Sequence, residues 1–436
     1  MPAKLRYHEQ QSRLYRTRAR FPVVQAGRGS GKSLILKMKV ARFLSIHRPD
    51  VIAAGDIPRY FYGLPTTAQA KRVAWDSLKA LIPYEWYQPR GVGKTFYESD
   101  RIIKTRFGSE LHVVGLDVPH RIEGNQWCGG VLDECADQRP KVFDLTVRPA
   151  LTAFRGWCAR SGVPKRFGIG AEDFNKAFDL AAENKNRDPD MEAYHWLSET
   201  VVDPEELERI KASLDERDYN EQYRASREQA SGACFHAFDE PSNVSLLAEY
   251  DHTRPIVVGS DFNVDPMCWV LCHREANKLI VFGEIFLRGT NTQETLDTLY
   301  AKHGHHKAGF EFFGDASSRA RKTAASATDY VQIYNDDRFA NKQVYYSNSN
   351  PPIVDRLAAC NSMLRNAKGE HRVIINPRCV RLIADLKHRA FKAGTSEPND
   401  KGDLGHMSDA FGYIIVKVFP LSIEIATPGE VVIVNA

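Results

Sequence analysis

The stretch that decides the fold is Val23–Leu44, VVQAGRGSGKSLILKMKVARFL. Residues 26–33 read AGRGSGKS, which follows the phosphate-binding pattern G-x-x-x-x-G-K-[ST] except that Ala26 replaces the first glycine. In such a loop, backbone N–H groups surround the phosphates of a nucleotide, and the N-terminus of the next helix adds positive potential. The sequence therefore predicts a strand over residues 21–27, a nucleotide-binding turn and a helix over residues 33–47. A Gly/Ser turn that binds nothing is the alternative.

The residues of this turn have distinct expected roles. Lys32 is expected to reach the β- and γ-phosphates of the nucleotide, and Ser33 to ligate Mg²⁺. The rest of the loop would surround the phosphates with its backbone, at Gly27, Arg28, Gly29, Ser30 and Gly31. Upstream, Gln10 and Gln11 stand at a distance from which a glutamine can contact the adenine of ATP, with a surface role as the alternative for both.

A second acidic motif fits the same site. Residues 128–137, CGGVLDECAD, predict a buried strand that ends at Asp133 and Glu134. An acid in this position can hold the Mg²⁺ shell, and an adjacent glutamate can polarise the attacking water. Taken alone, the pair could be an ordinary acidic turn at a strand end. Downstream of the nucleotide loop it indicates the NTPases with an added strand and a catalytic glutamate, which include helicases, translocases and packaging motors.

Arg121 lies shortly before this acidic strand, in the stretch VPHRIEGNQW. An arginine in this position could reach the γ-phosphate bound by a neighbouring subunit, as an arginine finger. A surface salt bridge is the alternative.

The first part of the 436-residue chain alternates strand-like and helical stretches. Strands are expected over 59–65, 110–117, 128–134 and 156–164, and a helix over 68–83. This alternation predicts an α/β domain with a parallel sheet over residues 1–170. Residues 171–250 contain charged helices with weak apolar faces and are interpreted as a lid or linker subdomain. A new apolar strand near residue 255 opens a third range, 251–436.

This third range predicts a mixed sheet. Three strands follow one another over 255–262, 267–274 and 278–286. A helix over 292–303, strands over 309–315 and 342–347, and helices over 353–364 and 406–418 come next. If the strands are ordered as in ribonuclease H, the first and fourth lie side by side and bring Asp261 and Asp315 together, with Asp409 on the last helix above them.

Three converging carboxylates repel one another unless a metal is present. Their natural use is to hold two Mg²⁺ or Mn²⁺ ions about 4 Å apart, where one ion activates water and the other stabilises the leaving oxygen of a phosphodiester. Asp265 and His406 could add ligands. Each aspartate taken singly could instead be a loop or cap residue.

The composition of the chain indicates which kind of partner it binds and in which cellular compartment it acts. The net charge is +4, and basic residues concentrate near the N-terminus, at Lys4, Arg6, Arg13, Arg16, Arg18, Arg20, Arg28, Lys32, Lys37, Lys39 and Arg42. This bias favours a polyanionic partner, with a solvated basic face as the alternative. None of the eight cysteines forms a Cys-x-x-Cys pair, so neither a zinc site nor a disulfide framework is expected, and reduced thiols suggest the cytosol. Neither a secretory signal nor a membrane-spanning stretch is evident.

Together these motifs resemble the large subunit of tailed-bacteriophage terminases over nearly the whole chain. The resemblance rests on AGRGSGKS, on RIEGNQWCGGVLDECAD followed by VRPAL, and on VVGSDFNVDPM, FFGDASSRA and HMSDAFGY. It implies a P-loop ATPase domain followed by a ribonuclease H-like nuclease domain. It assigns the catalytic glutamate to Glu134 and the nuclease acids to Asp261, Asp315 and Asp409. Residues 161–168 are similar to the family's coupling motif, from which Val163 departs.

The resemblance also implies a function. ATP hydrolysis would drive double-stranded viral DNA through the portal into the procapsid, and the nuclease would cut concatemeric DNA at the start and end of packaging. The cofactors would be ATP with Mg²⁺, and two Mg²⁺ or Mn²⁺ ions in the nuclease. The subunits would form a ring on the portal, although members of the family are often monomeric in isolation. A small terminase subunit and the portal would be the protein partners. Arg319, Arg321 and Lys322 would contact DNA phosphates. The protein would act in the cytoplasm of the infected bacterium and be absent from the mature virion.

Two rival functions remain. The first is a helicase or translocase whose ribonuclease H-like domain is inactive and only binds DNA. The presence of all three acids disfavours it. The second is an assembly protein that uses ATP binding to dock on a portal. Glu134 disfavours this second rival, because a docking module needs no glutamate to activate water.

Overall fold

The computed structural model describes the chain except for residues 1–7, 185–186, 229–231, 264, 317–327, 340, 346–348, 393–394, 401 and 421–436. The chain divides into two compact units. The N-terminal unit comprises Met1–Leu207 and Asn220–Gln229, and the C-terminal unit comprises Glu208–Tyr219 and Ala230–Ala436. The sequence predicted three ranges, whereas the structure divides residues 171–250 between the two units.

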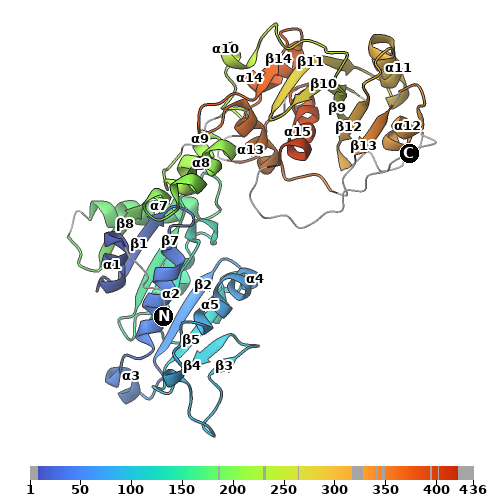
Figure 1. Ribbon diagram of the computed structural model, residues 1–436. Helices are drawn as coiled ribbons and strands as arrows, with labels where there is room; N and C mark the ends of the chain where they lie inside the picture. The colour runs from blue at the N-terminus through green and yellow to red at the C-terminus, as the bar shows by residue number, and fades with distance from the viewer. Residues whose placement is uncertain are drawn as a thin grey trace. The chain divides into compact units, whose positions relative to one another are not determined.

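The N-terminal unit is built on an eight-stranded sheet of order β3-β4-β5-β2-β6-β7-β1-β8 (Figure 1). The strands β5, β2, β6, β7, β1 and β8 pair in parallel with their neighbours in this order. Strands β3 and β4 add an antiparallel edge beside β5. The parallel strands therefore end at one common edge, where open α/β sheets bind their ligands. The strands are β1 (Phe21–Ala26), β2 (Arg59–Leu64), β3 (Phe96–Tyr97), β4 (Ile102–Lys104), β5 (Glu110–Gly115), β6 (Gly129–Leu132), β7 (Trp157–Gly162) and β8 (Met191–Trp196).

Helices cover this sheet and create a core on each face. Successive side chains of a strand point to opposite faces, so Tyr60 and Tyr62 of β2 pack into one core and Phe61 into the other. The expected helix at 68–83 is interrupted by a π-helical turn, Ala70–Trp75. The helices are α1 (Glu9–Arg16), α2 (Lys32–Phe43), α3 (Pro49–Ala53), α4 (Thr67–Gln69), α5 (Asp76–Lys79), α6 (Arg148–Ala150) and α7 (Ala171–Glu183). Helices α8 (Pro204–Ser213) and α9 (Glu216–Tyr223) each contain residues of both units.

The C-terminal unit is built on a mixed sheet of order β13-β12-β9-β10-β11-β14. Strands β9, β10 and β11 form an antiparallel meander, and β12 pairs in parallel with β9. The predicted adjacency of the first and fourth strands is therefore confirmed. The strands are β9 (Ile256–Asp261), β10 (Met267–Glu275), β11 (Lys278–Leu287), β12 (Phe310–Gly314), β13 (Lys342–Tyr345) and β14 (Val373–Ile375).

The last helix of the C-terminal unit packs closely on this sheet. Gly259 of β9 has no room for a side chain, because a Cβ there would lie 2.3 Å from the carbonyl oxygen of Ala410. This approach places the first turn of α15 at the end of β9. The helices of the unit are α10 (Glu240–Asn243), α11 (Thr292–His303), α12 (Asp329–Asn335), α13 (Ile353–Leu364), α14 (Val380–His388) and α15 (His406–Val418).

The cysteines behave as core residues. All eight are free and buried, and Cys268 and Cys272 of β10 pack in the core of the C-terminal unit. The prediction that they form no disulfide framework is confirmed. Within the described residues, the helices are all too short or too polar to cross a lipid bilayer.

Gly259→Ala is expected to destabilise the C-terminal unit by about 1–3 kcal/mol, because the added methyl group overpacks the contact with α15. Differential scanning calorimetry measures the change. Gly283→Ala in β11 is the matched control, since the nearest atom to its Cβ lies 3.5 Å away, an ordinary contact distance. Equal unfolding temperatures of the two variants would contradict the close approach of α15.

Candidate functional sites

The glycine-rich turn that is predicted to bind phosphates joins β1 to α2 at the carboxyl edge of the parallel strands. Gly29 and Gly31 have left-handed backbones, with φ of +68° and +78°, which glycine adopts without strain. Gly31 also meets Gln11, whose Nε2 lies 2.7 Å from the position of a Cβ. The glycines of the pattern are therefore required by backbone conformation and by packing. Lys32 begins α2 and is buried.

Asp133 follows β6 at the same edge and is held by its two neighbouring strands. The hydroxyl of Tyr62 in β2 donates to Asp133 Oδ2 over 2.6 Å, and that of Ser161 in β7 donates to Oδ1 over 2.6 Å. Burial raises the pKa of Tyr62, the charge of Asp133 raises it further, and Ser33 lowers it. Ser33 and Asp133, the two expected Mg²⁺ ligands, therefore both interact with the Tyr62 hydroxyl.

Glu134 pairs with the lysine of the turn. Its Oε1 lies 3.9 Å from Lys32 Nζ. Burial raises the pKa of Glu134, although the charge of Lys32 opposes the shift. A carboxylate with a raised pKa is suited to take a proton from water, which is the role expected of Glu134. The structure thus brings together the two motifs that the sequence placed about 100 residues apart.

The two upstream glutamines differ in their contacts. Gln11 is buried and donates through Nε2 to the Ser30 carbonyl oxygen over 2.9 Å, whereas Gln10 is only partly buried. Gln11 therefore touches the turn, and the adenine contact expected of Gln10 stays a prediction. Arg121 is exposed and donates to Thr67 Oγ1 over 3.3 Å. Its assignment as a finger toward a neighbouring subunit stays a prediction.

Two later segments of the chain contact the turn, and sequence reasoning missed both. The N–H of Gly27 donates to the Trp196 carbonyl over 3.1 Å, and the N–H of Arg28 donates to the Gln222 carbonyl over 2.7 Å. A Cβ at Gly27 would lie 2.2 Å from Ser198 Oγ. No local motif marks these partners, because they lie more than 160 residues downstream in the sequence.

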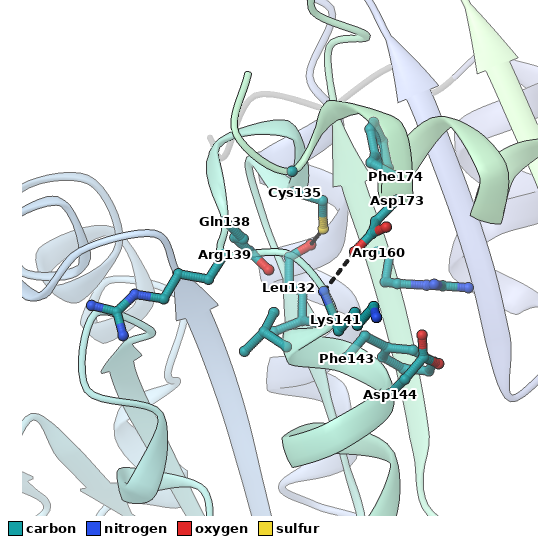
Figure 2. A pocket seen from close by; sticks show the side chains of 12 residues that line it. Leu132, Cys135, Gln138, Arg139, Lys141, Phe143, Asp144, Arg160, Asp173 and Phe174 are labelled. Carbon is teal, nitrogen blue, oxygen red and sulfur yellow. Dashed lines mark hydrogen bonds between the residues drawn. The ribbon is translucent and has the colours of Figure 1, made fainter. Parts of the chain in front are cut away.

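The loop after Glu134 is anchored on the other side of the sheet, at the cavity shown in Figure 2. The guanidinium of Arg160 in β7 lies 4.1 Å from the centre of the Phe143 ring. The N–H of Lys141 donates to Asp173 Oδ2 of α7 over 2.5 Å, and the partly open cavity has a volume of about 50 Å³. The hydrogen bond from Lys141 to Asp173 therefore ties this loop to α7.

The second candidate site lies at the ends of β9 and β12. Ser260 pairs with Gly314, so Asp261 and Asp315 are the next residues at the same edge, and both are buried. Asp261 Oδ2 lies 2.9 Å from His406 Nδ1 and accepts a hydrogen bond from Asn263. Burial raises the pKa of Asp261, and the charges of Asp409 and Asp315 raise it further, whereas His406 opposes the shift.

Asp409 lies on α15 and is bound by two arginines, Arg389 at 2.6 Å and Arg356 at 2.9 Å. Asp265, considered as an additional ligand, is exposed and pairs with Arg288. Among the residues that the structure describes, no three His, Cys, Asp or Glu side chains are arranged to hold a metal ion. The carboxylate oxygens of Asp261, Asp315 and Asp409 are nevertheless the ligand type that suits Mg²⁺ or Mn²⁺.

Comparison with solved structures decides the fold. The large terminase of a thermophilic bacteriophage matches with a TM-score of 0.58 at 12% identity, over 95% of this chain and 99% of that chain. The fold is that of a bacteriophage large terminase. A structure of the same phage's large terminase in complex with ADP matches with a TM-score of 0.55 at 13% identity, over 95% and 99% of the two chains. Neither a protein-family model nor a curated protein matches the sequence.

Within this large-terminase fold, three lysines of the basic N-terminal segment are buried, whereas Arg13, Arg16, Arg18 and Arg42 are exposed. Lys37 donates to the Val73 carbonyl and to Ser77, and Lys39 donates to the Thr17 carbonyl over 3.1 Å. Burial lowers the pKa of Lys39 to about 8. These two lysines and Lys32 therefore do not belong to a solvated basic face. Lys4 and Arg6 of this segment, and the other predicted phosphate contacts Arg319, Arg321 and Lys322, lie outside the described residues.

Tyr62→Phe is expected to destabilise the N-terminal unit by about 1–3 kcal/mol, because Asp133 Oδ2 loses a buried donor. Calorimetric unfolding of the full chain measures the loss. Tyr60→Phe in the same strand is the control, since the Tyr60 hydroxyl is buried without a hydrogen-bond partner in the described part of the chain. A Tyr62 variant as stable as the Tyr60 variant would show that the hydroxyl does not hold Asp133.

Proposed function

We propose that the protein is the large subunit of a tailed-phage terminase, an ATPase that moves double-stranded DNA and a metal-dependent endonuclease that cuts it. The observation that carries the proposal is the Lys32–Glu134 pair at the sheet edge of a chain with the large-terminase fold. The N-terminal unit would hydrolyse ATP and the C-terminal unit would cut DNA. A structure of the thermophilic phage's large terminase with ATP-gamma-S, which matches with a TM-score of 0.55 at 13% identity, agrees with a nucleotide ligand.

In the proposed ATPase, Lys32 binds the β- and γ-phosphates, and the turn from Gly27 to Gly31 surrounds them with backbone donors. Mg²⁺, held by Ser33 and Asp133, would neutralise the phosphate charge. Glu134 accepts the proton of the attacking water. The hydrogen bonds from Tyr62 and Ser161 keep the Asp133 carboxylate in place for this role.

In the proposed nuclease, Asp261, Asp315 and Asp409 hold two Mg²⁺ or Mn²⁺ ions, with His406 beside Asp261. The ions would supply an activated water and stabilise the leaving oxygen. The raised pKa of Asp261 supports the assignment, because the charges of the other two carboxylates oppose its ionisation. Cleavage would occur at the beginning and end of packaging.

The partners follow from the proposed role. They are double-stranded DNA, a small terminase subunit that selects it, and the portal of the procapsid. A ring of copies would assemble on the portal, where Arg121 of one copy would serve the nucleotide of the next. The site of action would be the cytoplasm of the infected bacterium.

One observation favours a second candidate. Asp409 is paired with two arginines, and the described residues contain no three-residue metal group. A DNA translocase whose second unit binds DNA without cutting it would also fit this arrangement. The nuclease assay below separates the two functions.

Glu134→Gln is expected to bind ATP with near-wild-type affinity and to lower its turnover at least about 100-fold, because the amide cannot accept the proton of the attacking water. Binding of a fluorescent ATP analogue and steady-state phosphate release measure the two properties. Asp137→Asn is the control, since Asp137 lies on the same loop but pairs with Lys165. Full turnover by the Glu134 variant would remove its assigned role.

Asp315→Asn is expected to abolish Mn²⁺-dependent cutting of plasmid DNA while leaving ATP turnover unchanged, because one of the metal-holding carboxylates is lost. Gel analysis of plasmid cutting by the full chain, with and without chelator, provides the measurement. Asp265→Asn, at an exposed acid outside the cluster, should cut normally. Wild-type protein that never cuts would instead support the translocase with an inactive second unit.

A further inference from the structure

Two buried arginines converge on one oxygen atom of Asp409. Arg389, at the end of α14, is 1% exposed, and its Nη1 donates to Asp409 Oδ1 over 2.6 Å. Arg356, on α13, is 4% exposed, and its Nη2 lies 2.9 Å from the same Oδ1. No described residue donates a hydrogen bond to Oδ2. The two carboxylate oxygens of Asp409 therefore have different surroundings.

Arg389 connects Asp409 to a second acid. Its Nε and Nη2 donate to the two carboxylate oxygens of Asp400 over 2.8 and 2.9 Å, and its Nη1 also donates to Ser408 Oγ. A bidentate pair of this kind fixes the plane of the guanidinium. Arg389 therefore links the segment before α15, through Asp400, to the first turn of α15, through Asp409.

Arg356 occupies a space that α15 leaves open for it. A Cβ at Gly412 would lie 2.7 Å from Arg356 Cγ, and the Arg356 guanidinium lies 4.7 Å from the centre of the Tyr413 ring. Glycine is a poor helix former, so its presence inside α15 costs about 1 kcal/mol relative to alanine. The passage of the Arg356 side chain to Asp409 is the packing reason for this glycine.

We propose that Arg356 and Arg389 are positioning residues of the nuclease centre, which lock Asp409 Oδ1 and leave Oδ2 as the oxygen offered to a divalent cation. This inference rests on the proposed nuclease function. Carboxylates that bind metals are themselves commonly held by hydrogen bonds, and loss of such a partner typically weakens metal binding about 10–100-fold.

The same lock sets the position of His406. His406 and Asp409 lie three residues apart on α15 and thus on neighbouring positions of one helix face. A rotation of the helix that moved Asp409 away from the arginines would also move His406 away from Asp261 Oδ2. The arginines therefore act on two groups of the centre without touching DNA or metal themselves.

Isothermal titration of the full chain with Mn²⁺, without DNA, tests the proposal, with Asp261→Asn as the baseline for binding elsewhere. Gly412→Ala and Arg356→Gln are expected to raise the Kd for Mn²⁺ about 10–100-fold. Gly412→Ala keeps both arginines and displaces only Arg356, so Asp409 retains its pair with Arg389. Arg356→Lys, which retains the charge, should recover part of the affinity.

Arg338→Gln is the matched control, because Arg338 pairs with Asp336 and Asp297 in the same unit, away from Asp409. Its Kd for Mn²⁺ should equal that of the wild type. If Gly412→Ala and Arg356→Gln are folded at the titration temperature and bind Mn²⁺ as tightly as the wild type, the arginines are structural only and the proposal is overturned. If the wild type binds no more Mn²⁺ than Asp261→Asn does, the proposed nuclease function itself is contradicted.

Discussion

The parallel pairing of strands is the constraint on which both candidate sites depend. In the N-terminal unit β6 lies between β2 and β7, so hydroxyl groups from both neighbours reach the carboxylate of Asp133 at the edge where all three strands end. In the C-terminal unit the pairing of β9 with β12 places Asp261 and Asp315 at one edge. In both units the strand register alone places the acidic residues at one edge of the sheet.

Opposite charges then make these acid-rich edges tolerable. An unpaired buried charge is costly, and three of the key acids have a cationic or ionisable neighbour from a different element. Glu134 lies beside Lys32, Asp261 beside His406, and Asp409 between two arginines. The same requirement explains the buried lysines of α2, whose ammonium groups donate to backbone carbonyls and so cannot contribute to a basic surface.

Local patterns predicted much of this structure. The expected ranges 292–303, 353–364 and 406–418 agree with α11, α13 and α15, and the turn between β1 and α2 follows from its glycines. The hydrophobic pattern did not predict β8, because Glu192 and His195 make this strand polar. It also did not predict the contacts of Gln11 and Gln222 with the turn. Such contacts depend on chain segments that meet only after folding.

Glu134 departs from the backbone geometry that its residue type prefers. Its φ and ψ of 56° and 48° are left-handed, a conformation that costs a non-glycine residue roughly 1–2 kcal/mol. Glycine or asparagine would occupy this position with less strain. The chain thus gives up some thermodynamic stability where β6 ends, which is the kind of compromise seen when a side chain is kept for its chemistry and not for its fit to the fold.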